Sequence, residues 1–442
     1  MTIQARVLML TKKQDPEQDC FGRLGQDLDR LGWRTITTSD ADAAQACVSD
    51  LQIEAILIDS AHPSATPEGL SLLRSACAPR RLPVLQIAQS RDLELPDGWD
   101  MVFDYDAHAQ QIALSLEHIV RANVAQEEYE LRLKTLAAQN IPLPAPPEDR
   151  PLSVLSVGPP APDFLALSHH MRVRGADVLA AFSSYSAFDY LHDHTFDAVV
   201  LWGTDSVSEP LSIATGMRRN TRLYHMPVFL RLQKPVALDL GDAYLRGVND
   251  ISAPDASEPE IADRVIRLAQ SYRRQTNTRR ALEDIRHNPR MDTDTGLFTR
   301  ELFAAHLARL SAAASERNRP LSVCVLKIAE TPEVTQARQR KALQRAIPQI
   351  GNMIARLVRA EDTAGRLSDE VFALALPATR LENARIVGER IAAVISCTAF
   401  ESGGSERPFV IEFEIGVAEL KENEPAAVAL TRAGKALSLA PV

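Results

Sequence analysis

Ala55-Ile-Leu-Ile-Asp59 is a run of four apolar residues that ends on a carboxylate, and Ala198-Val-Val-Leu-Trp202 repeats this run with an indole at its end. Short unbroken apolar runs are typical of strands that are buried on both faces, as in parallel sheets. Further runs, separated by helix-length segments, lie at 6–10, 83–87, 101–103, 153–157, 227–230 and 248–251. Because the pattern occurs twice, the sequence predicts two tandem α/β domains, each a doubly wound parallel sheet.

A proline-rich segment separates the two α/β regions. Proline lacks an amide donor and has a fixed φ, so residues 141–151 are predicted to form a stiff, extended linker. We therefore place one domain at 1–140, a second at 152–275 and a third at 276–442.

Long helices are predicted to close the first two domains, at 111–139 and 261–286. Both stretches carry apolar residues at helical spacing among many charged ones. Their length predicts that they extend past their own sheets, where they can transmit a signal or dimerise.

The third region has a different pattern of apolar and polar residues. It contains a longer apolar strand at 321–328, a helix at 342–359 and a late alternating strand at 409–416. Alternation of apolar and polar residues is typical of an antiparallel sheet with one exposed face. We therefore expect an α/β domain with a mostly antiparallel sheet.

The composition excludes several classes of function. The 442 residues carry a net charge of −9 and no long basic run, which argues against a nucleic-acid binder. The five cysteines are widely spaced without a C-x-x-C pair, so neither a disulfide framework nor a zinc site is indicated. No stretch approaches the roughly 18 uninterrupted apolar residues of a membrane span. We expect a cytoplasmic protein without membrane insertion, bound metal or cofactor.

The end of the first apolar run carries a possible phosphoacceptor. Asp59 closes the strand and Pro63 follows at the fourth place, which resembles the phosphoacceptor strand and loop of response-regulator receiver domains. The resemblance implies a flavodoxin-like fold with its site at the strand ends. Phosphorylation in that family requires Mg²⁺ held by an acidic pair, together with a Ser or Thr and a Lys. The matching places in this chain hold Thr11, Lys12, Ala88 and Tyr105.

The phosphorylation chemistry is thus incomplete in both halves. Asp59 is either a strand-end residue without metal partners or a live phosphoacceptor. In the second half Trp202 takes the acceptor's place, and its large amphipathic ring is suited to filling the vacated pocket. We expect this half to act as an adaptor.

Three segments of the last region resemble GGDEF diguanylate cyclase domains: Asp292-Thr-Asp-Thr-Gly-Leu-Phe-Thr-Arg300, Glu414-Ile-Gly-Val-Ala418 and Ala433-Gly-Lys-Ala-Leu437. With two receiver-like domains upstream, the chain is similar to PleD-type response regulators, and most similar to their degenerate members that act as cyclic di-GMP effectors. The resemblance implies a nucleotidyl-cyclase-like α/β fold for the third domain.

The resemblance also identifies a catalytic site that has lost key residues. In active cyclases of this family, one carboxylate on the first strand and another in the GGDEF hairpin hold metal ions on GTP. Lys327 occupies the first-strand place, and the hairpin reads Ser368-Asp369-Glu370-Val371-Phe372. Both glycines of the motif are therefore lost, and Val371 replaces the catalytic acid. Glu370 is the one metal-binding acid of the motif that remains. Further departures, at places that bind guanine and triphosphate in the family, are Thr335, Gln344 and Pro441.

The allosteric motif of the same family is intact. Arg359-Ala-Glu-Asp362 matches the R-x-x-D turn of the inhibitory cyclic di-GMP site, five residues before the hairpin, and Arg390 matches a second arginine of that site. A guanidinium bonds bidentately to guanine O6 and N7, and a carboxylate accepts guanine N–H donors. The alternative is a surface ion pair of little energetic value. Arg309 is a further candidate for completing the site.

The sequence therefore favours a non-catalytic cyclic di-GMP receptor and protein-interaction adaptor. Resemblance to the family implies a homodimer, localisation at a cell pole, and a role in cell-cycle control by delivering adaptor proteins and protease substrates to ClpXP. Two alternatives stay open: a phosphorylation-dependent response regulator acting through Asp59, and a residual diguanylate cyclase.

Overall fold

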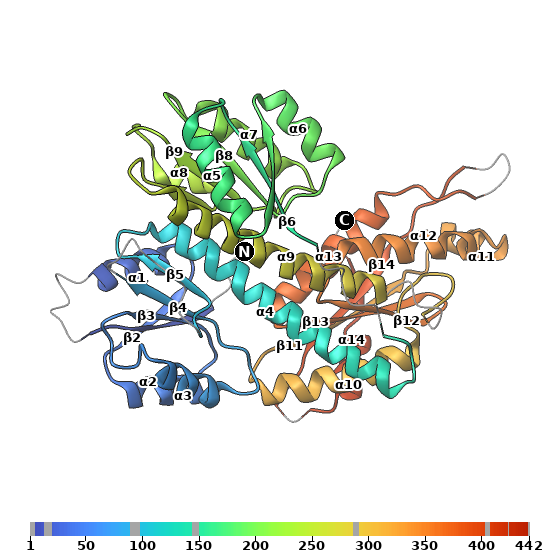
Figure 1. Cartoon of the computed structure of the whole chain (residues 1–442). Coiled ribbons are helices and arrows are strands. Elements are labelled where there is room, and N and C mark those ends of the chain that lie inside the picture. The colour runs from blue at the N-terminus through green and yellow to red at the C-terminus, as the bar shows by residue number, and fades with distance from the viewer. Residues whose placement is uncertain are drawn as a thin grey trace. The chain divides into compact units, whose positions relative to one another are not determined.

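The computed structural model describes residues 5–12, 20–88, 98–143, 150–285, 291–402, 407–422 and 424–440. The chain folds into two compact units (Figure 1). Unit 1 combines Met1–Ala122 with Glu148–Asn277, and unit 2 combines Asn123–Pro147 with Thr278–Val442. Pro441 and most of the predicted linker at 141–151 lie outside the described residues.

The first half of unit 1 is a five-stranded parallel sheet in the order β2-β1-β3-β4-β5, which is the flavodoxin-like order. Successive residues of a strand point to opposite faces, so Leu8 packs under one pair of helices and Met9 under the other. The strands are β1 Arg6–Leu10, β2 Arg34–Thr38, β3 Ile53–Asp59, β4 Val84–Ala88 and β5 Met101–Asp104. The helices are α1 Cys20–Arg30, α2 Ala41–Asp50, α3 Pro67–Cys77 and α4 Ala109–Ala138.

The second half of unit 1 repeats this connectivity in the order β10-β9-β8-β6-β7, again with parallel strands. The two cores under this sheet are built by α6, α7 and α8 on one face and by α5 and α9 on the other. The strands are β6 Leu152–Val157, β7 Ala176–Ala181, β8 Ala198–Gly203, β9 Val228–Leu232 and β10 Asp250–Ser252. The helices are α5 Pro162–Val173, α6 Ser184–Asp193, α7 Ser208–Arg219, α8 Leu240–Leu245 and α9 Glu258–Asp284.

Each half has one strand more than its apolar runs predicted. The additional strands, β2 and β7, lie at the edges of their sheets. The side chains of β2 (Arg-Thr-Ile-Thr-Thr) are all exposed or half-buried, so this strand shows no continuous apolar run. An edge strand has one neighbour and does not need the residues of a central strand.

The two halves of unit 1 contact each other through the first part of α4. Gln111 Nε2 donates to Asp250 Oδ1 on β10 at 2.8 Å. The ring of His108 stacks on that of Tyr244, with 5.7 Å between the centroids.

Unit 2 is built on a five-stranded sheet in the order β12-β13-β11-β14-β15. All its pairings are antiparallel, which confirms the predicted sheet type. The strands are β11 Leu321–Ile328, β12 Thr363–Ser368, β13 Val371–Pro377, β14 Phe413–Glu419 and β15 Ser438–Leu439. The helices are α10 Arg300–Glu316, α11 Pro332–Gln339, α12 Ala342–Leu357, α13 Leu381–Ser396 and α14 Ala426–Lys435.

The strand predicted at 409–416 was placed too early. It begins at Phe413, whereas Phe409 forms an isolated bridge with Phe400. Phe409, Ile411 and Phe413 are all buried, so every second residue is buried already before the strand begins. The sequence pattern therefore did not show where the strand starts.

Both long helices pass from unit 1 into unit 2, as their predicted length indicated. The boundary falls after Ala122 in α4 and after Asn277 in α9. Within unit 2, Thr278 Oγ1 donates to Gln126 Oε1 at 3.0 Å, which joins the two helices. Leu131 and Leu136 of α4 belong to the same buried cluster as α10, so the end of α4 is part of the core of unit 2.

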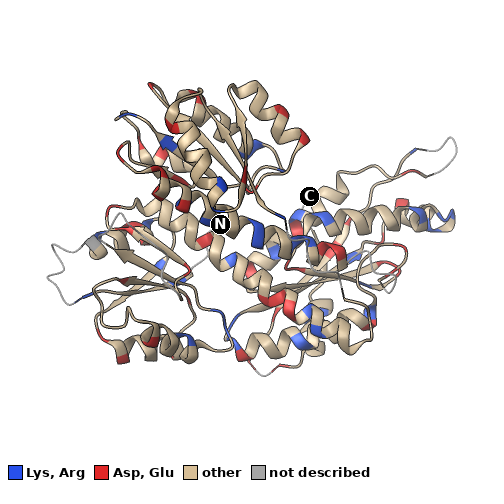
Figure 2. Ribbon diagram, in the orientation of Figure 1, with Lys and Arg blue, Asp and Glu red and all other residues tan. Residues whose placement is uncertain are grey.

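Basic and acidic residues are interspersed along the ribbon in the view of Figure 2. Pairs one helical turn apart occur on both long helices, between Arg121 and Glu117 on α4 and between Arg279 and Glu283 on α9. Exposed pairs of this kind contribute little to stability. Among the described residues, no helix is both long and apolar enough to cross a membrane.

Candidate functional site

Asp59 lies at the carboxyl end of β3, and its carboxylate accepts a hydrogen bond from another side chain of the same half. The Tyr105 hydroxyl donates to Asp59 Oδ1, and the backbone N–H of Ala61 donates to the same oxygen at 2.9 Å. Asp59 is only 7% exposed. A phenol is a neutral donor, so it does not supply the positive charge that a lysine would bring to a phosphoryl group. Across the described residues, no group of three His, Cys, Asp or Glu side chains is placed to hold a metal ion.

In the second half, the indole of Trp202 fills the space at the end of β8. Its Nε1 donates to Ser156 Oγ at 3.0 Å, and its ring lies 5.4 Å from that of Phe164. A Cβ added at Gly158 would lie 2.4 Å from Trp202 Cβ, so the close approach of the indole requires glycine there.

Arg231, at the end of β9, is the cross-strand neighbour of Trp202. It is buried, and its Nη1 donates to the carbonyls of Leu232 at 2.7 Å and Ala253 at 2.9 Å. A buried guanidinium that bonds to carbonyls holds loops together. The carboxyl ends of these strands are therefore packed with side chains.

In unit 2, Lys327 on β11 forms an ion pair with Glu414 on β14, with 3.0 Å between Nζ and Oε2. The two residues lie opposite each other across the antiparallel pair of strands. On the other side of β11, Val371 is the direct cross-strand partner of Lys327. A cation and an apolar residue thus stand at two of the places singled out from the sequence.

Arg338, at the end of α11, engages the hairpin acid Glu370. Arg338 Nε donates to Glu370 Oε1 at 2.8 Å, and Nη2 donates to Glu370 Oε2 at 2.6 Å. The same guanidinium bonds to Glu330 at 2.8 and 3.0 Å. The hydrogen bonds that Arg338 donates to Glu370 and to Glu330 raise the pKa of Arg338, and the bond from Arg338 lowers the pKa of Glu330. Arg338 was not among the sequence candidates, because a single arginine in a charged helix carries no distinctive signal.

The first two residues of the hairpin are open to solvent. Ser368 is exposed, and Asp369 keeps 98% of its side chain exposed at 3.6 Å from Arg366. Glu370 is the hairpin carboxylate with a bidentate partner.

The R-x-x-D turn, residues 359–362, connects the end of α12 to the start of β12. The backbone N–H of Arg359 donates to Asp362 Oδ2 at 3.0 Å, which holds the carboxylate over the turn. Arg359 is half-buried and Asp362 is 3% exposed. The turn therefore places one partly accessible guanidinium beside one buried carboxyl.

Arg390 on α13 contacts the end of α12, just before the turn. Its Nη2 donates to the carbonyl of Leu357, two residues before Arg359, at 3.0 Å. The structure thus places Arg390 against the end of α12, two residues before the turn that carries Arg359 and Asp362. Arg309, the further candidate, is exposed on α10.

Residues 290–440 match the family model described as diguanylate cyclase, GGDEF domain. The last region of the chain is a GGDEF domain. This match confirms the predicted identity of the third region and covers about a third of the 442 residues. A search of curated proteins found no match to this chain.

Several solved structures are similar to the GGDEF domain. They include the GGDEF domain of FimX from Pseudomonas aeruginosa, 20% identical over 33% of this chain and 90% of that one, with a TM-score of 0.31. The GGDEF domain of DgcB from Caulobacter crescentus, solved in complex with c-di-GMP, is 22% identical over 34% and 85%, with a TM-score of 0.31. The active GGEEF domain of a diguanylate cyclase from Vibrio cholerae is 20% identical over 31% and 87%, with a TM-score of 0.29.

Within the GGDEF domain, Asp362 has an unusual ionisation. Burial raises the pKa of its carboxyl to about 7, helped by the nearby charge of Glu361. The N–H and the charge of Arg359, together with the charge of Arg132, oppose this shift. Near neutral pH the carboxyl is thus divided between its protonated and ionised forms, and a ligand with N–H donors would favour the ionised form.

A residue outside the predicted motif also contacts the turn. Arg132, on the part of α4 that belongs to unit 2, donates to the backbone carbonyl of Asp362 at 2.9 Å. In the sequence Arg132 is one of many charged residues of a long helix. No pattern along the helix distinguishes it from a solvated arginine.

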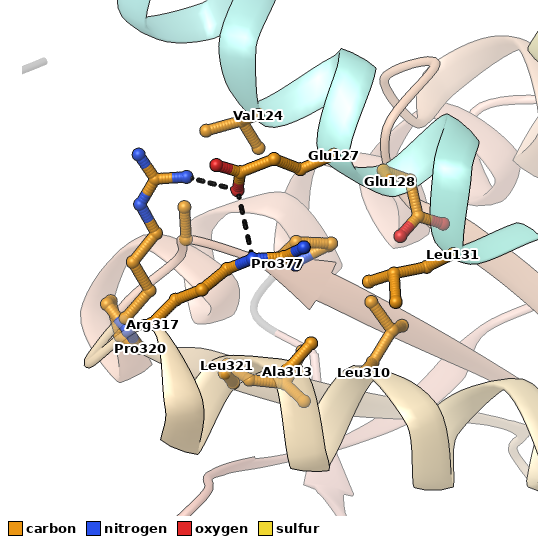
Figure 3. A pocket seen from close by; sticks show the side chains of 13 residues that line it. Val124, Glu127, Glu128, Leu131, Leu310, Ala313, Arg317, Pro320, Leu321 and Pro377 are labelled. Carbon is orange, nitrogen blue, oxygen red and sulfur yellow. Dashed lines mark hydrogen bonds and ion pairs between the residues drawn. The ribbon is translucent and has the colours of Figure 1, made fainter. Parts of the chain in front are cut away.

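The cavity between α4 and α10 is too small for a nucleotide (Figure 3). Its volume is about 30 Å³, and a single water already needs ~10–15 Å³ of such space. Glu127 forms ion pairs with Arg319 at 2.6 Å and with Arg317 at 3.7 Å at its wall. The cavity is a packing gap within unit 2 and not a nucleotide site.

Proposed function

We propose that this chain is a non-catalytic receptor for cyclic di-GMP, with Arg359, Asp362 and Arg390 as the ligand-binding residues. The observation that carries the proposal is the contrast between the two sites of the GGDEF domain. The R-x-x-D turn has both its charged groups and Arg390 beside it, whereas the hairpin acid Glu370 is taken by Arg338.

The chemistry of the turn suits a guanine-containing ligand. The guanidinium of Arg359 can donate to guanine O6 and N7, and the ionised carboxyl of Asp362 can accept from guanine N–H groups. Arg390 adds a cation that can meet a second guanine or a phosphate. A dinucleotide with two guanines and two phosphates uses all three groups.

The charged residues near the hairpin favour the absence of cyclase activity. Two-metal catalysis requires carboxylates that are free to bind cations. Here Lys327 pairs with Glu414, and Arg338 bonds to both Glu370 and Glu330. Cations held at these places repel a second cation.

We further propose that the two parallel α/β domains are receiver-like docking modules, with domains at 1–140 and 152–275 followed by the GGDEF region from 276. The flavodoxin-like strand order supports this assignment. In this proposal the protein acts as a homodimer, at a cell pole, and presents adaptor proteins and substrates to ClpXP. These last roles follow from the family resemblance alone.

Calorimetric titration of the full chain with cyclic di-GMP tests the ligand proposal. We expect saturable binding that Arg359→Ala and Arg390→Ala each weaken at least tenfold, the loss expected for a charge-assisted contact of ~1.5–3 kcal/mol. Arg385→Ala is the matched control, because Arg385 is an exposed arginine on the same helix as Arg390 and lies five residues away, on another face. No heat from the wild-type protein at saturating ligand would overturn the proposal.

A further inference from the structure

We infer that Arg132 of α4 is a positioning residue for the ligand turn, and that its buried hydrogen-bond network couples the turn to this helix. The inference rests on the proposed function, since it assigns a role in shaping the cyclic di-GMP site. It adds to the site a residue that lies 227 positions before Arg359 in the sequence (359 − 132).

Arg132 grips the turn at three points. Its Nη2 lies 3.1 Å from the carbonyl of Ala360, 2.9 Å from that of Asp362 and 2.9 Å from Thr363 Oγ1. The side chain is 1% exposed. One guanidinium therefore contacts the backbone segment that leads into β12, and that includes the residue carrying the candidate ligand carboxyl.

Glu128, one helical turn earlier on α4, holds Arg132 in this position. Its Oε1 accepts from Arg132 Nε at 2.9 Å and from the hydroxyl of Thr363 at 3.1 Å. Burial opposes ionisation of Glu128, but the charges and hydrogen bonds of His306 and Arg132 outweigh it and lower the pKa of this carboxyl. A buried carboxylate with such partners is a rigid anchor, because each donor has a fixed direction.

His306 connects the anchor to the rest of the GGDEF domain. Its Nε2 lies 2.8 Å from Glu128 Oε1, and its Nδ1 lies 2.9 Å from Thr135 Oγ1. The hydroxyl of Thr135 gives its single proton to the carbonyl of Leu131, so Nδ1 must be the donor in its contact with Thr135. His306 thereby ties α10 to two residues of α4 that lie about two helical turns apart.

This arrangement acts on the ligand site in two ways. It sets the path of the backbone at residues 360–363, on which the direction of the Asp362 side chain depends. It also brings a positive charge near that carboxyl, and this charge is one of the effects that keep the pKa of Asp362 from rising further. The other charged groups that face Asp362 are Glu361 and Arg359.

Within unit 2, the network ties the turn to the last part of α4. A shift of α4 relative to the GGDEF domain would break the bonds from Arg132 to the turn. By reciprocity, a ligand that prefers the ordered turn stabilises the docked position of the helix.

The test compares Arg132→Met with Arg132→Lys in the full chain, and Arg121→Met on the exposed part of the same helix is the control. We expect Arg132→Met to weaken cyclic di-GMP binding about tenfold at pH 7. We also expect it to move the pH midpoint of binding upward, because the cation near Asp362 is lost. Arg132→Lys keeps that charge, so it should leave the midpoint in place while losing part of the affinity.

Hydrogen exchange in the absence of ligand supplies a second readout. The amides of residues 360–363 should exchange faster in Arg132→Met than in the wild type or in Arg121→Met. Should Arg132→Met fail to fold, Thr363→Val removes two hydrogen bonds of the network, the one from Arg132 and the one to Glu128, and is measured in the same way. Wild-type binding with an unchanged midpoint and unchanged exchange in these variants would overturn this inference alone. Absence of binding by the wild type would overturn the proposed function and the inference with it.

Discussion

Arg338 donates two parallel hydrogen bonds to Glu370, from Nε and from Nη2, so an arginine of α11 occupies both carboxylate oxygens of the hairpin acid. A bidentate pair of this kind has the geometry that guanidinium and carboxylate prefer. The partial exposure of both side chains limits its contribution to stability. Its consequence is chemical, because the acid is no longer free to bind a cation.

We therefore expect no cyclic di-GMP or linear intermediate when the purified protein is incubated with GTP and Mg²⁺ or Mn²⁺. Arg338→Ala should release Glu330 and Glu370 and raise Mn²⁺ affinity, which paramagnetic relaxation of water protons measures. It should still give no product, since Lys327 and Val371 remain. Turnover of GTP by the wild type, detected by chromatography, would contradict the non-catalytic assignment.

The affinity for cyclic di-GMP should depend on pH around neutrality. With the pKa of Asp362 at about 7 in the free protein, a ligand that needs the ionised carboxyl must displace its proton at lower pH. Affinity should therefore fall about tenfold between pH 8 and pH 6. Calorimetry at pH 6 in buffers of different ionisation enthalpy should show release of close to one proton per site. A constant affinity across this range would show that Asp362 does not accept from the ligand.

Replacing Asp362 by Asn should separate stability from binding. A carboxyl whose pKa is raised in the folded state holds more protons when folded than when unfolded, so it lowers the free energy of unfolding as pH rises from about 4 to about 7. Asp362→Asn removes this penalty and can still accept from the N–H of Arg359. We expect denaturant unfolding at pH 8 to show a stabilised variant that no longer binds the ligand. At pH 4 the two proteins should have nearly equal stability.

Because the Tyr105 hydroxyl donates to the carboxylate of Asp59, we expect that the first half does not respond to phosphoryl donors. Acetyl phosphate and beryllofluoride should leave the oligomeric state unchanged in light scattering, and Asp59→Asn should retain ligand binding. Tyr105→Phe removes a hydroxyl that bonds to a buried carboxylate, so it should lower the free energy of unfolding by ~1–3 kcal/mol. A change of oligomeric state with beryllofluoride that is lost in Asp59→Asn would favour a live phosphoacceptor instead.

The sequence predicted the central strands well and the edge strands poorly, for a physical reason. A central parallel strand such as β3 is buried along its whole length and is apolar from Ala55 to Ile58, whereas β2 is bordered on one side only and tolerates Arg34 and three threonines. The turn at Arg359 and Asp362 was also found in advance, because its spacing to the hairpin is local. Arg132 and Arg338 were not found, because their partners lie far away along the chain and nothing in their own segments marks them.

The packing of Trp202 against Gly158 predicts a strong coupling between two positions of the second half. A Cβ at Gly158 would lie 2.4 Å from Trp202 Cβ and 2.7 Å from Cγ, so Gly158→Ala should displace the indole and its bond to Ser156. We expect a loss of ~1–3 kcal/mol for this overpacked variant and ~3–5 kcal/mol for Trp202→Ala, which leaves a cavity.

In the double variant the added methyl group no longer meets an indole, so Gly158→Ala should cost little in the Trp202→Ala background. A double-mutant cycle from denaturant unfolding measures this coupling. Gly434→Ala is a matched control, because a Cβ at that glycine would meet no atom within 4 Å. Additive effects of the two substitutions would contradict the close packing of the indole against Gly158.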